Sequence, residues 1–255
     1  MSKYSVFFFF GRWRKNVNEL LIRGLKVDWG EIAPDSYLRR IGSIQKINAL
    51  DFHSRVTFFV GENGSGKSTL LEAMAVSAGF NPEGGTFNYR FTTRDSHSEL
   101  YGAMSLIRSP GRLKWGYFLR AESFYNVATA EEEYSRLGGI PRGYHLKSHG
   151  ESFLATAQDN FRGGGLYFLD EPEAALSPQR QLTLIVEIAR CVKENAQFFI
   201  VTHSPILLGI PDAEILSFDG GPIHPVSYEE TDSYRITEMF LRSREQLLKR
   251  LLEED

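Results

Sequence analysis

Cysteine is almost missing from this chain. Only one, Cys191, stands among 255 residues. A single cysteine excludes a disulfide within the chain. Cys191 falls in an amphipathic stretch, residues 178–195, where we expect it to be a small core residue and not a nucleophile.

Long apolar runs are also lacking. The aromatic run Phe7–Phe10 is brief, and Gly11 and Arg12 interrupt it. A helix that crosses a bilayer needs about 20 apolar residues, and a signal peptide needs a longer apolar centre than four. We therefore expect a cytoplasmic protein without a transmembrane segment.

Neither sign of charge is in large excess, because the formal net charge is −3. Binding to a phosphate backbone needs clustered Lys and Arg, so the net charge does not support a nucleic-acid partner. Nucleic-acid binding stays open only through a basic N-terminal portion in which aromatic residues are interleaved. Solvated surfaces explain that portion better. Its members are Arg12, Trp13, Arg14, Lys15, Arg23, Lys26, Trp29, Arg39 and Arg40.

Sustained heptads and internal repeats are absent too. Glycine and proline recur at short spacing between residues 70 and 147, which excludes a coiled-coil arm there. The length fits a single α/β domain over residues 1–255. Within it we expect a small inserted helical or irregular lobe at about residues 81–158.

What the chain does contain is a glycine-rich loop, residues 61–69, with the sequence GENGSGKST. A β-branched and aromatic run precedes it at residues 55–60, and strong helix formers follow at 70–75, so the order is strand, loop, helix. The glycines let backbone N–H groups turn toward phosphate oxygens, and a helix N-terminus favours negative charge. The loop predicts binding of a nucleoside triphosphate.

Each residue type in this loop has a chemical role. We expect Lys67 to reach the β- and γ-phosphates, Ser68 to offer its hydroxyl to Mg²⁺, and Thr69 to lie near the α-phosphate. The remaining members surround the phosphates with backbone groups. They are Gly61, Glu62, Asn63, Gly64, Ser65 and Gly66.

A second motif combines an apolar run, residues 166–169, with two carboxylates, Asp170 and Glu171. The run predicts a buried parallel strand with acid groups at its carboxyl end. There Asp170 would hold Mg²⁺ and Glu171 would polarise a water for in-line attack. A strand ending in a solvated acidic turn is the plain alternative. The glycine-rich loop on the same chain favours hydrolysis.

A third apolar run, residues 198–202, ends in His203, Ser204 and Pro205. Strand carboxyl ends line the ligand crevice of open α/β sheets, so an imidazole there can bond the γ-phosphate or hold the attacking water. The alternative is a packed or capping histidine. The position after a third buried strand favours the catalytic role for His203.

In this order the motifs resemble those of ABC-type (ATP-binding cassette) ATPases. Gly61–Thr69 matches the Walker A motif, Leu166–Glu171 matches Walker B, and His203 matches the switch histidine. The resemblance implies a P-loop NTPase fold of the α/β class, with a mixed sheet flanked by helices. It also implies ATP and Mg²⁺ as cofactors and the reaction of ATP with water to give ADP and phosphate.

The family's signature segment has a degenerate counterpart at Ser148–Ser152. The resemblance implies an ATP-dependent homodimer in which Ser148, Gly150 and Glu151 of one chain face the γ-phosphate on the other. Ala174–Ser177 would be the D-loop at that interface. From the residues alone, Ser148–Ser152 is a polar turn that caps a helix. A zinc site at His145 and His149 is disfavoured by Gly150.

The motif style is similar to that of stand-alone bacterial ATPases near the SMC-like and RecF-like branch. A Q-loop glutamine is not evident, and Glu122 or Asn126 stands in the place where the family has it. Tyr37 is a candidate for stacking on adenine. The resemblance implies ATP-driven switching of a partner protein or substrate, in DNA repair, maintenance or defence. Two alternatives stay open, an ABC transporter subunit and a non-hydrolysing module that ATP locks.

The C-terminal stretch, residues 237–255, alternates apolar residues with charges. This pattern predicts an amphipathic helix that packs onto the core or onto a partner chain.

Overall fold

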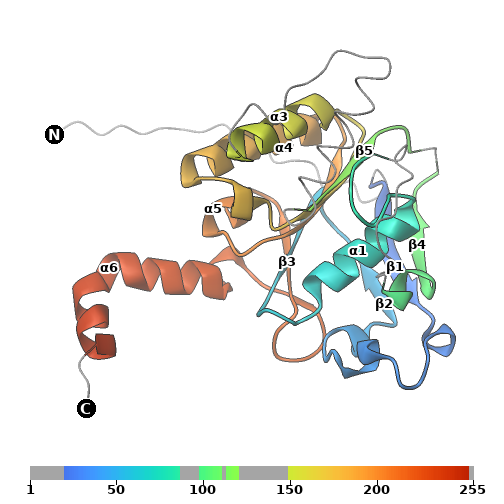
Figure 1. Cartoon of the computed structure of the whole chain (residues 1–255), viewed down its shortest axis with the longest axis horizontal. Coiled ribbons are helices and arrows are strands. Elements are labelled where there is room, and N and C mark those ends of the chain that lie inside the picture. The colour runs from blue at the N-terminus through green and yellow to red at the C-terminus, as the bar shows by residue number, and fades with distance from the viewer. Residues whose placement is uncertain (1–19, 87–97, 111–112, 121–148, 253–255) are drawn as a thin grey trace.

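The structure is a computed structural model that describes residues 20–86, 98–110, 113–120 and 149–252 (Figure 1). Its larger sheet has the order β5-β6-β7-β3-β8-β9, with strands β3 (Val56–Val60), β5 (Gly116–Arg120), β6 (Leu166–Asp170), β7 (Gln197–Val201), β8 (Glu214–Ser217) and β9 (His224–Pro225). Its smaller sheet has the order β2-β1-β4, with strands β1 (Ile22–Val27), β2 (Ala49–Asp51) and β4 (Met104–Arg108). The helices described are α1 (Lys67–Ala78), α3 (His149–Asn160), α4 (Pro178–Lys193), α5 (Pro205–Leu208) and α6 (Asp232–Leu252).

In the larger sheet, the strands from β5 to β8 run parallel and β9 pairs antiparallel with β8. Every residue of β3, β6 and β7 is buried, as the uninterrupted apolar runs predict for parallel strands. In register, Asp170 lies beside Val201, and Val201 lies beside Phe59. The three strands therefore end at one edge of the sheet, where the loops that follow them meet.

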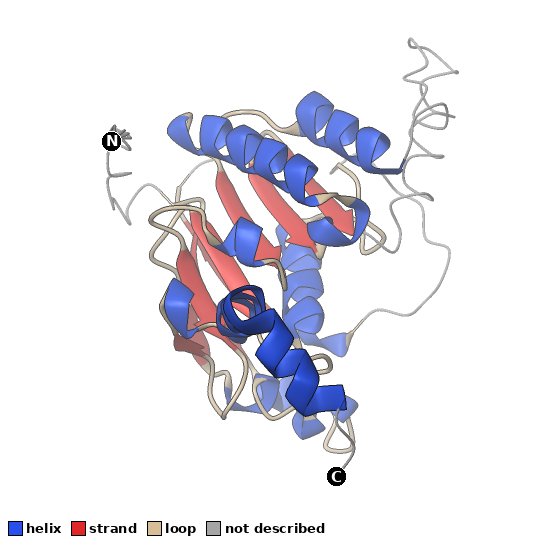
Figure 2. Cartoon of the chain, turned by 90° about the vertical axis from the view of Figure 1, so that its left-hand side faces the viewer, coloured by secondary structure: helices blue, strands red, loops and turns tan. Residues whose placement is uncertain are grey.

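Helices cover both faces of this sheet (Figure 2). Successive residues of a strand point to opposite faces, so each apolar strand supplies side chains to both layers of the core. One face, which packs with α1, carries Phe59, Phe168 and Phe199. The other face, which packs with α3 and α4, carries Phe58, Tyr167 and Phe198. In each set the β6 and β7 rings are stacked, with centroids 5.5 Å and 4.7 Å apart. The fold class predicted from the sequence, a mixed α/β sheet flanked by helices, is confirmed.

The two sheets are joined through Gln197, which is completely buried at the start of β7. Its side-chain oxygen accepts from the Ile22 N–H at 2.8 Å, and its side-chain nitrogen donates to the Ile22 carbonyl at 2.9 Å. One side chain thus satisfies both backbone groups of the first residue of β1, which removes the cost of burying them unpaired.

Helix α4 confirms the amphipathic stretch predicted around Cys191. The thiol is completely buried beside Leu184, Ile188 and Val192, and burial raises its pKa to about 11. Leu182, in the same helix, is 56% exposed, so it lies on the side of α4 that faces away from the core.

The predicted inserted lobe, residues 81–158, lies partly outside the described residues, including positions 121–148 with Glu122, Asn126 and His145. Two described parts of this interval are strands of the sheets, β4 beside β1 and β5 beside β6. The inserted lobe itself stays a prediction.

Helix α6 confirms the predicted C-terminal helix but starts five residues earlier, at Asp232. It leaves the body of the protein on the side of β3 and bends at Ser243, where φ is −132° (Figure 1). No residue of α6 is buried, so packing onto the core is not what the structure shows. Among the described residues, no helix combines the length and apolar character needed to cross a membrane.

Candidate nucleotide site

The loop between β3 and α1 has the strained backbone of a phosphate cradle. Gly61, Gly64 and Gly66 have positive φ angles of 143°, 80° and 96°. A Cβ atom on Gly66 would lie 2.6 Å from Ile44 and 2.8 Å from Ile41, so only glycine fits there. Because α1 begins at Lys67, the first N–H groups of the helix have no acceptor within it and point out of its N-terminus.

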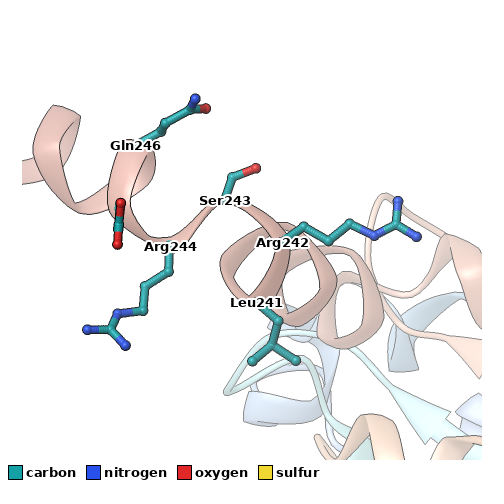
Figure 3. A pocket seen from close by; sticks show the side chains of 6 residues that line it. Leu241, Arg242, Ser243, Arg244 and Gln246 are labelled. Atoms are coloured by element: carbon teal, nitrogen blue, oxygen red, sulfur yellow. The ribbon is translucent and has the colours of Figure 1, made fainter.

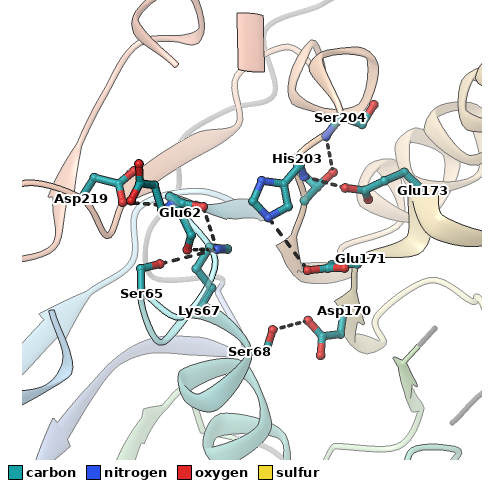
Figure 4. Close-up of polar contacts among 12 residues, drawn as sticks. Glu62, Ser65, Lys67, Ser68, Asp170, Glu171, Glu173, His203, Ser204 and Asp219 are labelled. Atoms are coloured by element: carbon teal, nitrogen blue, oxygen red, sulfur yellow. Dashed lines mark hydrogen bonds and ion pairs between the residues drawn. The ribbon is translucent and has the colours of Figure 1, made fainter. Parts of the chain in front are cut away.

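Lys67 is 4% exposed at the centre of this loop. Its Nζ donates to the carbonyls of Gly61 and Glu62, both at 2.7 Å (Figure 4). Burial lowers the pKa of Lys67, and the carboxylates of Asp219, Glu171 and Asp170 oppose that shift. A buried ammonium group beside free helix N–H groups is a site for an anion.

Ser68 and Asp170 meet across the site, although 102 positions separate them. The Ser68 hydroxyl donates to Asp170 Oδ1 at 2.9 Å (Figure 4). Two neighbouring ligands of an octahedral Mg²⁺, each about 2.05 Å from the ion, also lie about 2.9 Å apart. The two oxygens therefore fit one edge of a magnesium coordination shell, with phosphate and water oxygens to fill the rest.

Arg120 also contacts Asp170, and it is a residue that the sequence reasoning did not select. It stands at the end of β5, with Nε 3.7 Å from Asp170 Oδ2 and Nη1 2.6 Å from Glu72. The guanidinium group offsets part of the negative charge at the sheet edge. A single Arg at a strand end carries no local pattern that could have revealed this role.

Glu171 and His203 face each other at the same edge. Glu171 has a left-handed backbone, with φ 48° and ψ 53°, and its N–H donates to the Val201 carbonyl at 3.0 Å. Its Oε1 lies 3.9 Å from His203 Nε2, and the two side chains are 45% and 41% exposed (Figure 4). At this distance a carboxylate and an imidazole can hold one water or phosphate oxygen between them.

Two further residues hold the turn that carries His203. Glu173 Oε1 accepts from the His203 N–H at 2.5 Å, and Gln181 Oε1 accepts from the Ser204 hydroxyl at 2.5 Å. Both lie just after the Walker B strand, one in the 3₁₀ helix Pro172–Ala175 and one in α4. Neither residue was predicted from the sequence to have a role in the site.

Asp219 adds a fourth strand end to the site. It follows β8, and its Oδ1 accepts from the Glu62 N–H at 2.9 Å. Beside the loop lies a cavity of about 660 Å³ whose wall includes Gly61, Glu62 and His203. The first turns of α6 supply part of the same wall through Ser233, Ile236 and Thr237.

The described part of the predicted signature segment belongs to α3, which lies away from this loop in the same chain (Figure 1). Ser148 lies outside the described residues, whereas Gly150 and Glu151 form the first turn of α3. Glu151 pairs with Arg180 at 3.0 Å, and a Cβ on Gly150 would lie 2.8 Å from the Ala175 carbonyl. The segment thus packs against the predicted D-loop.

The other predicted residues of the loop lie as follows. Asn63 and Gly64 are exposed at its tip, and Thr69 is half-buried in α1. The Ser65 carbonyl accepts a hydrogen bond from the Ser43 hydroxyl. Within the described ranges, no group of three or more His, Cys, Asp or Glu side chains is arranged to hold a metal ion.

Comparisons with known proteins match the two halves of the site separately. A family model described as an AAA domain matches residues 37–107, which contain the loop with Lys67. Another, described as "AAA domain, putative AbiEii toxin, Type IV TA system", matches residues 152–209, which contain Asp170, Glu171 and His203. No match was found among curated proteins.

Among solved structures, the chain is similar to the SMC head domain from Thermotoga maritima, with 18% identity and a TM-score of 0.46 over 82% of this chain and 100% of that one. It is also similar to CbiO1 from Clostridium perfringens, part of the ABC transporter complex CbiONQ, with 14% identity and a TM-score of 0.46 over 91% and 100%. The chain is thus similar to AAA-type domains in two separate stretches, and the structure brings Lys67, Ser68 and Asp170 of these stretches together at one sheet edge.

Proposed function

We propose that this protein binds ATP together with Mg²⁺ and hydrolyses it, and that two copies close around the nucleotide during the cycle. One observation carries the proposal. The Ser68 to Asp170 hydrogen bond of 2.9 Å lies at the same sheet edge as the Glu171 and His203 pair.

Each residue of the site has a separate role in binding or hydrolysis. Lys67 and the N–H groups at the start of α1 bind the phosphates. Ser68 and Asp170 would hold Mg²⁺, which would supply positive charge beside the transferred phosphoryl group. Glu171 orients the attacking water and accepts its proton, and His203 holds the γ-phosphate or that water.

The exposure of Glu171 and His203 supports the dimer. Their side chains are 45% and 41% exposed, so the side of the site that meets the γ-phosphate is open to another molecule. Hydrolysis benefits from excluding bulk water, which a second copy would do. As the family resemblance implies, Ser148, Gly150 and Glu151 of that copy would complete the site.

The output of the cycle is, in our proposal, the switching of a partner protein or substrate. The family description matched at residues 152–209 includes a toxin–antitoxin system, which favours a defence role over DNA repair or maintenance. The transporter-subunit alternative stays open, and the candidates for the Q-loop position, Glu122 and Asn126, lie outside the described residues.

The test compares wild type with Glu171→Gln in Mg²⁺, with and without ATP, by light scattering and by phosphate release. We expect Glu171→Gln to retain ATP, to double its mass with ATP, and to lose turnover by roughly 10²- to 10⁴-fold. Full turnover in Glu171→Gln would show that another group activates the water. Turnover in wild type without any change in mass would retain the ATPase and reject the dimer.

A further inference from the structure

One side of α6 is apolar and exposed. Ile236, Met239 and Phe240 are spaced by three and four residues, which places them together along the helix before its bend at Ser243, and Leu251 follows after the bend. Ile236 is 60% exposed, Met239 48%, Phe240 38% and Leu251 69%. We call these four residues the α6 stripe. Exposed apolar side chains that gather in this way mark a site of contact with another molecule.

The α6 stripe begins at the nucleotide site. Ile236 lines the same cavity as Gly61, Glu62 and His203, so the base of α6 stands beside the Walker A loop. From there the helix leads away from the body of the protein (Figure 1) and bends at Ser243. Just before the bend, the exposed side chain of Leu241 points away from the helix (Figure 3). Any molecule that closes over the open nucleotide face meets this helix.

The charge of α6 favours a second copy of the chain as that molecule. Helix α6 carries five Arg or Lys and three Asp or Glu, a surplus of two positive charges, while the whole chain is −3, so the remainder carries −5. A basic helix and an acidic body attract each other between copies related by two-fold symmetry.

We propose that the α6 stripe of each protomer docks on a second copy of the chain when that copy covers the ATP face. The proposal rests on the ATP-dependent dimer of the proposed function, and it adds the surface that holds the dimer together beyond the nucleotide. Each copy contributes one helix, so the contact is formed twice.

The parent protein for the test is Glu171→Gln, and the stripe variant adds Phe240→Gln and Leu251→Gln to that parent. Both positions lie in the α6 stripe, and Gln keeps the helix propensity. The matched control, Arg242→Gln with Glu245→Gln, places the same side chain on the charged side and leaves the net charge unchanged. Sedimentation velocity with ATP over a protein concentration series gives the dimer dissociation constant.

We expect the stripe variant to weaken the ATP-bound dimer roughly tenfold or more, equal to about 1.4 kcal/mol, and the control to stay within about twofold. Equal constants for parent and stripe variant would overturn the docking proposal and leave the ATP dimer intact. A lower melting temperature with an unchanged constant would also overturn it, because the stripe would then be covered within its own chain. A parent that stays monomeric would reject both dimer proposals, while phosphate release by wild type would still preserve the ATPase.

A separate set of bonds concerns the turn that carries His203. Glu173 accepts from the His203 N–H at 2.5 Å through Oε1, while its Oε2 is buried and has no hydrogen-bond partner among the described residues. A buried carboxylate oxygen without a partner is costly, so its place in the fold needs a reason. The bond to the turn supplies one, because it sets where the imidazole lies.

The distance from Glu171 Oε1 to His203 Nε2 is 3.9 Å, longer than a hydrogen bond by about an ångström. A small shift of the turn therefore decides whether the two side chains bond. We infer that Glu173 is a positioning residue that places His203 for the hydrolysis assigned above, on which this inference rests. Gln181 secures the same turn through Ser204.

The test compares Glu173→Gln, which keeps an acceptor oxygen, with Glu173→Leu, which removes it. We expect Glu173→Leu to lower kcat for ATP roughly tenfold with an unchanged KM, and Glu173→Gln to restore kcat to within about threefold of wild type. Equal losses in both variants, or a loss confined to KM, would contradict the positioning role. Absence of turnover in wild type would reject the proposed ATPase itself, before either variant is compared.

Discussion

The carboxyl edge of the larger sheet and helix α6 depart from the usual distribution of side chains in opposite directions. At the sheet edge charged groups are buried, with Lys67 4% and Asp170 8% exposed. On α6 apolar groups are exposed, with Leu241 and Leu252 both at 75%. Charged residues are seldom buried, and apolar surface is seldom left together in water. In our proposals each exception lies where a further molecule completes the structure, a nucleotide at the edge and a protein at the helix.

The largest expected difference between the two regions is in stability. Leu169→Ala, in the completely buried β6, should lower the free energy of unfolding by about 2–5 kcal/mol, because it leaves a cavity. Leu241→Ala on α6 should change it by less than about 0.5 kcal/mol. Urea unfolding followed by circular dichroism measures both. A comparable loss in Leu241→Ala would mean that α6 is held against the body of the protein.

Removing the buried charge should abolish most nucleotide affinity. Lys67→Ala deletes a charged hydrogen-bond donor to phosphate, and we expect ATP affinity measured by calorimetry to fall roughly a hundredfold. Lys193→Ala, at the exposed end of α4, should stay within about twofold. Unchanged affinity in Lys67→Ala would remove the phosphate-loop assignment.

Thiol labelling can measure the difference between a buried position and an exposed position on α6. Burial raises the pKa of Cys191 to about 11 from an ordinary value of 9.0, so at pH 8 its thiolate fraction is roughly a hundredfold lower than that of an exposed thiol. Wild type should react slowly with a disulfide reagent until it is unfolded, and its rate should rise with pH toward 11. Leu241→Cys should add one thiol that reacts at once. Rapid labelling of native wild type would show that α4 opens readily.

The smallest expected effect concerns the metal. Asp170→Asn retains the shape of the side chain but removes its charge, and we expect the Mg²⁺ concentration needed for half-maximal ATPase activity to rise roughly tenfold. Binding of ATP in the presence of a chelator should stay within about threefold. The exposed Asp35→Asn is the control. An unchanged magnesium requirement in Asp170→Asn would move the metal site elsewhere.

The sheet edge was the part of the fold most open to prediction from the sequence. Its strands are short uninterrupted apolar runs, and the loop at Gly61–Thr69 has a local pattern in which each residue type has a physical reason. Parallel strands then bring Lys67, Asp170 and His203 to one edge without further information. The resemblance to a known family added the expected fold, but the local signals already indicated the site.

The contacts that secure this edge were not open to prediction. Glu173 bonds His203 thirty positions away, and Asp219 bonds Glu62 from 157 positions away, so no pattern within a short window contains either pair. The orientation of α4 was also ambiguous. Leu182 is exposed and Leu184 is buried, although both are leucines in one helix, because only the packing of the neighbouring elements decides which side faces the core.

The position of β7 sets the width of the site. It lies between β6 and β3 in the larger sheet, so the strand that ends in Asp170 is two strand spacings, about 9.6 Å, from the strand that leads to the loop with Lys67. A phosphoryl group, its metal and an attacking water placed in line fit within that width. If β6 paired directly with β3, the two strands would be only about 4.8 Å apart, which is too narrow for the same groups placed in line.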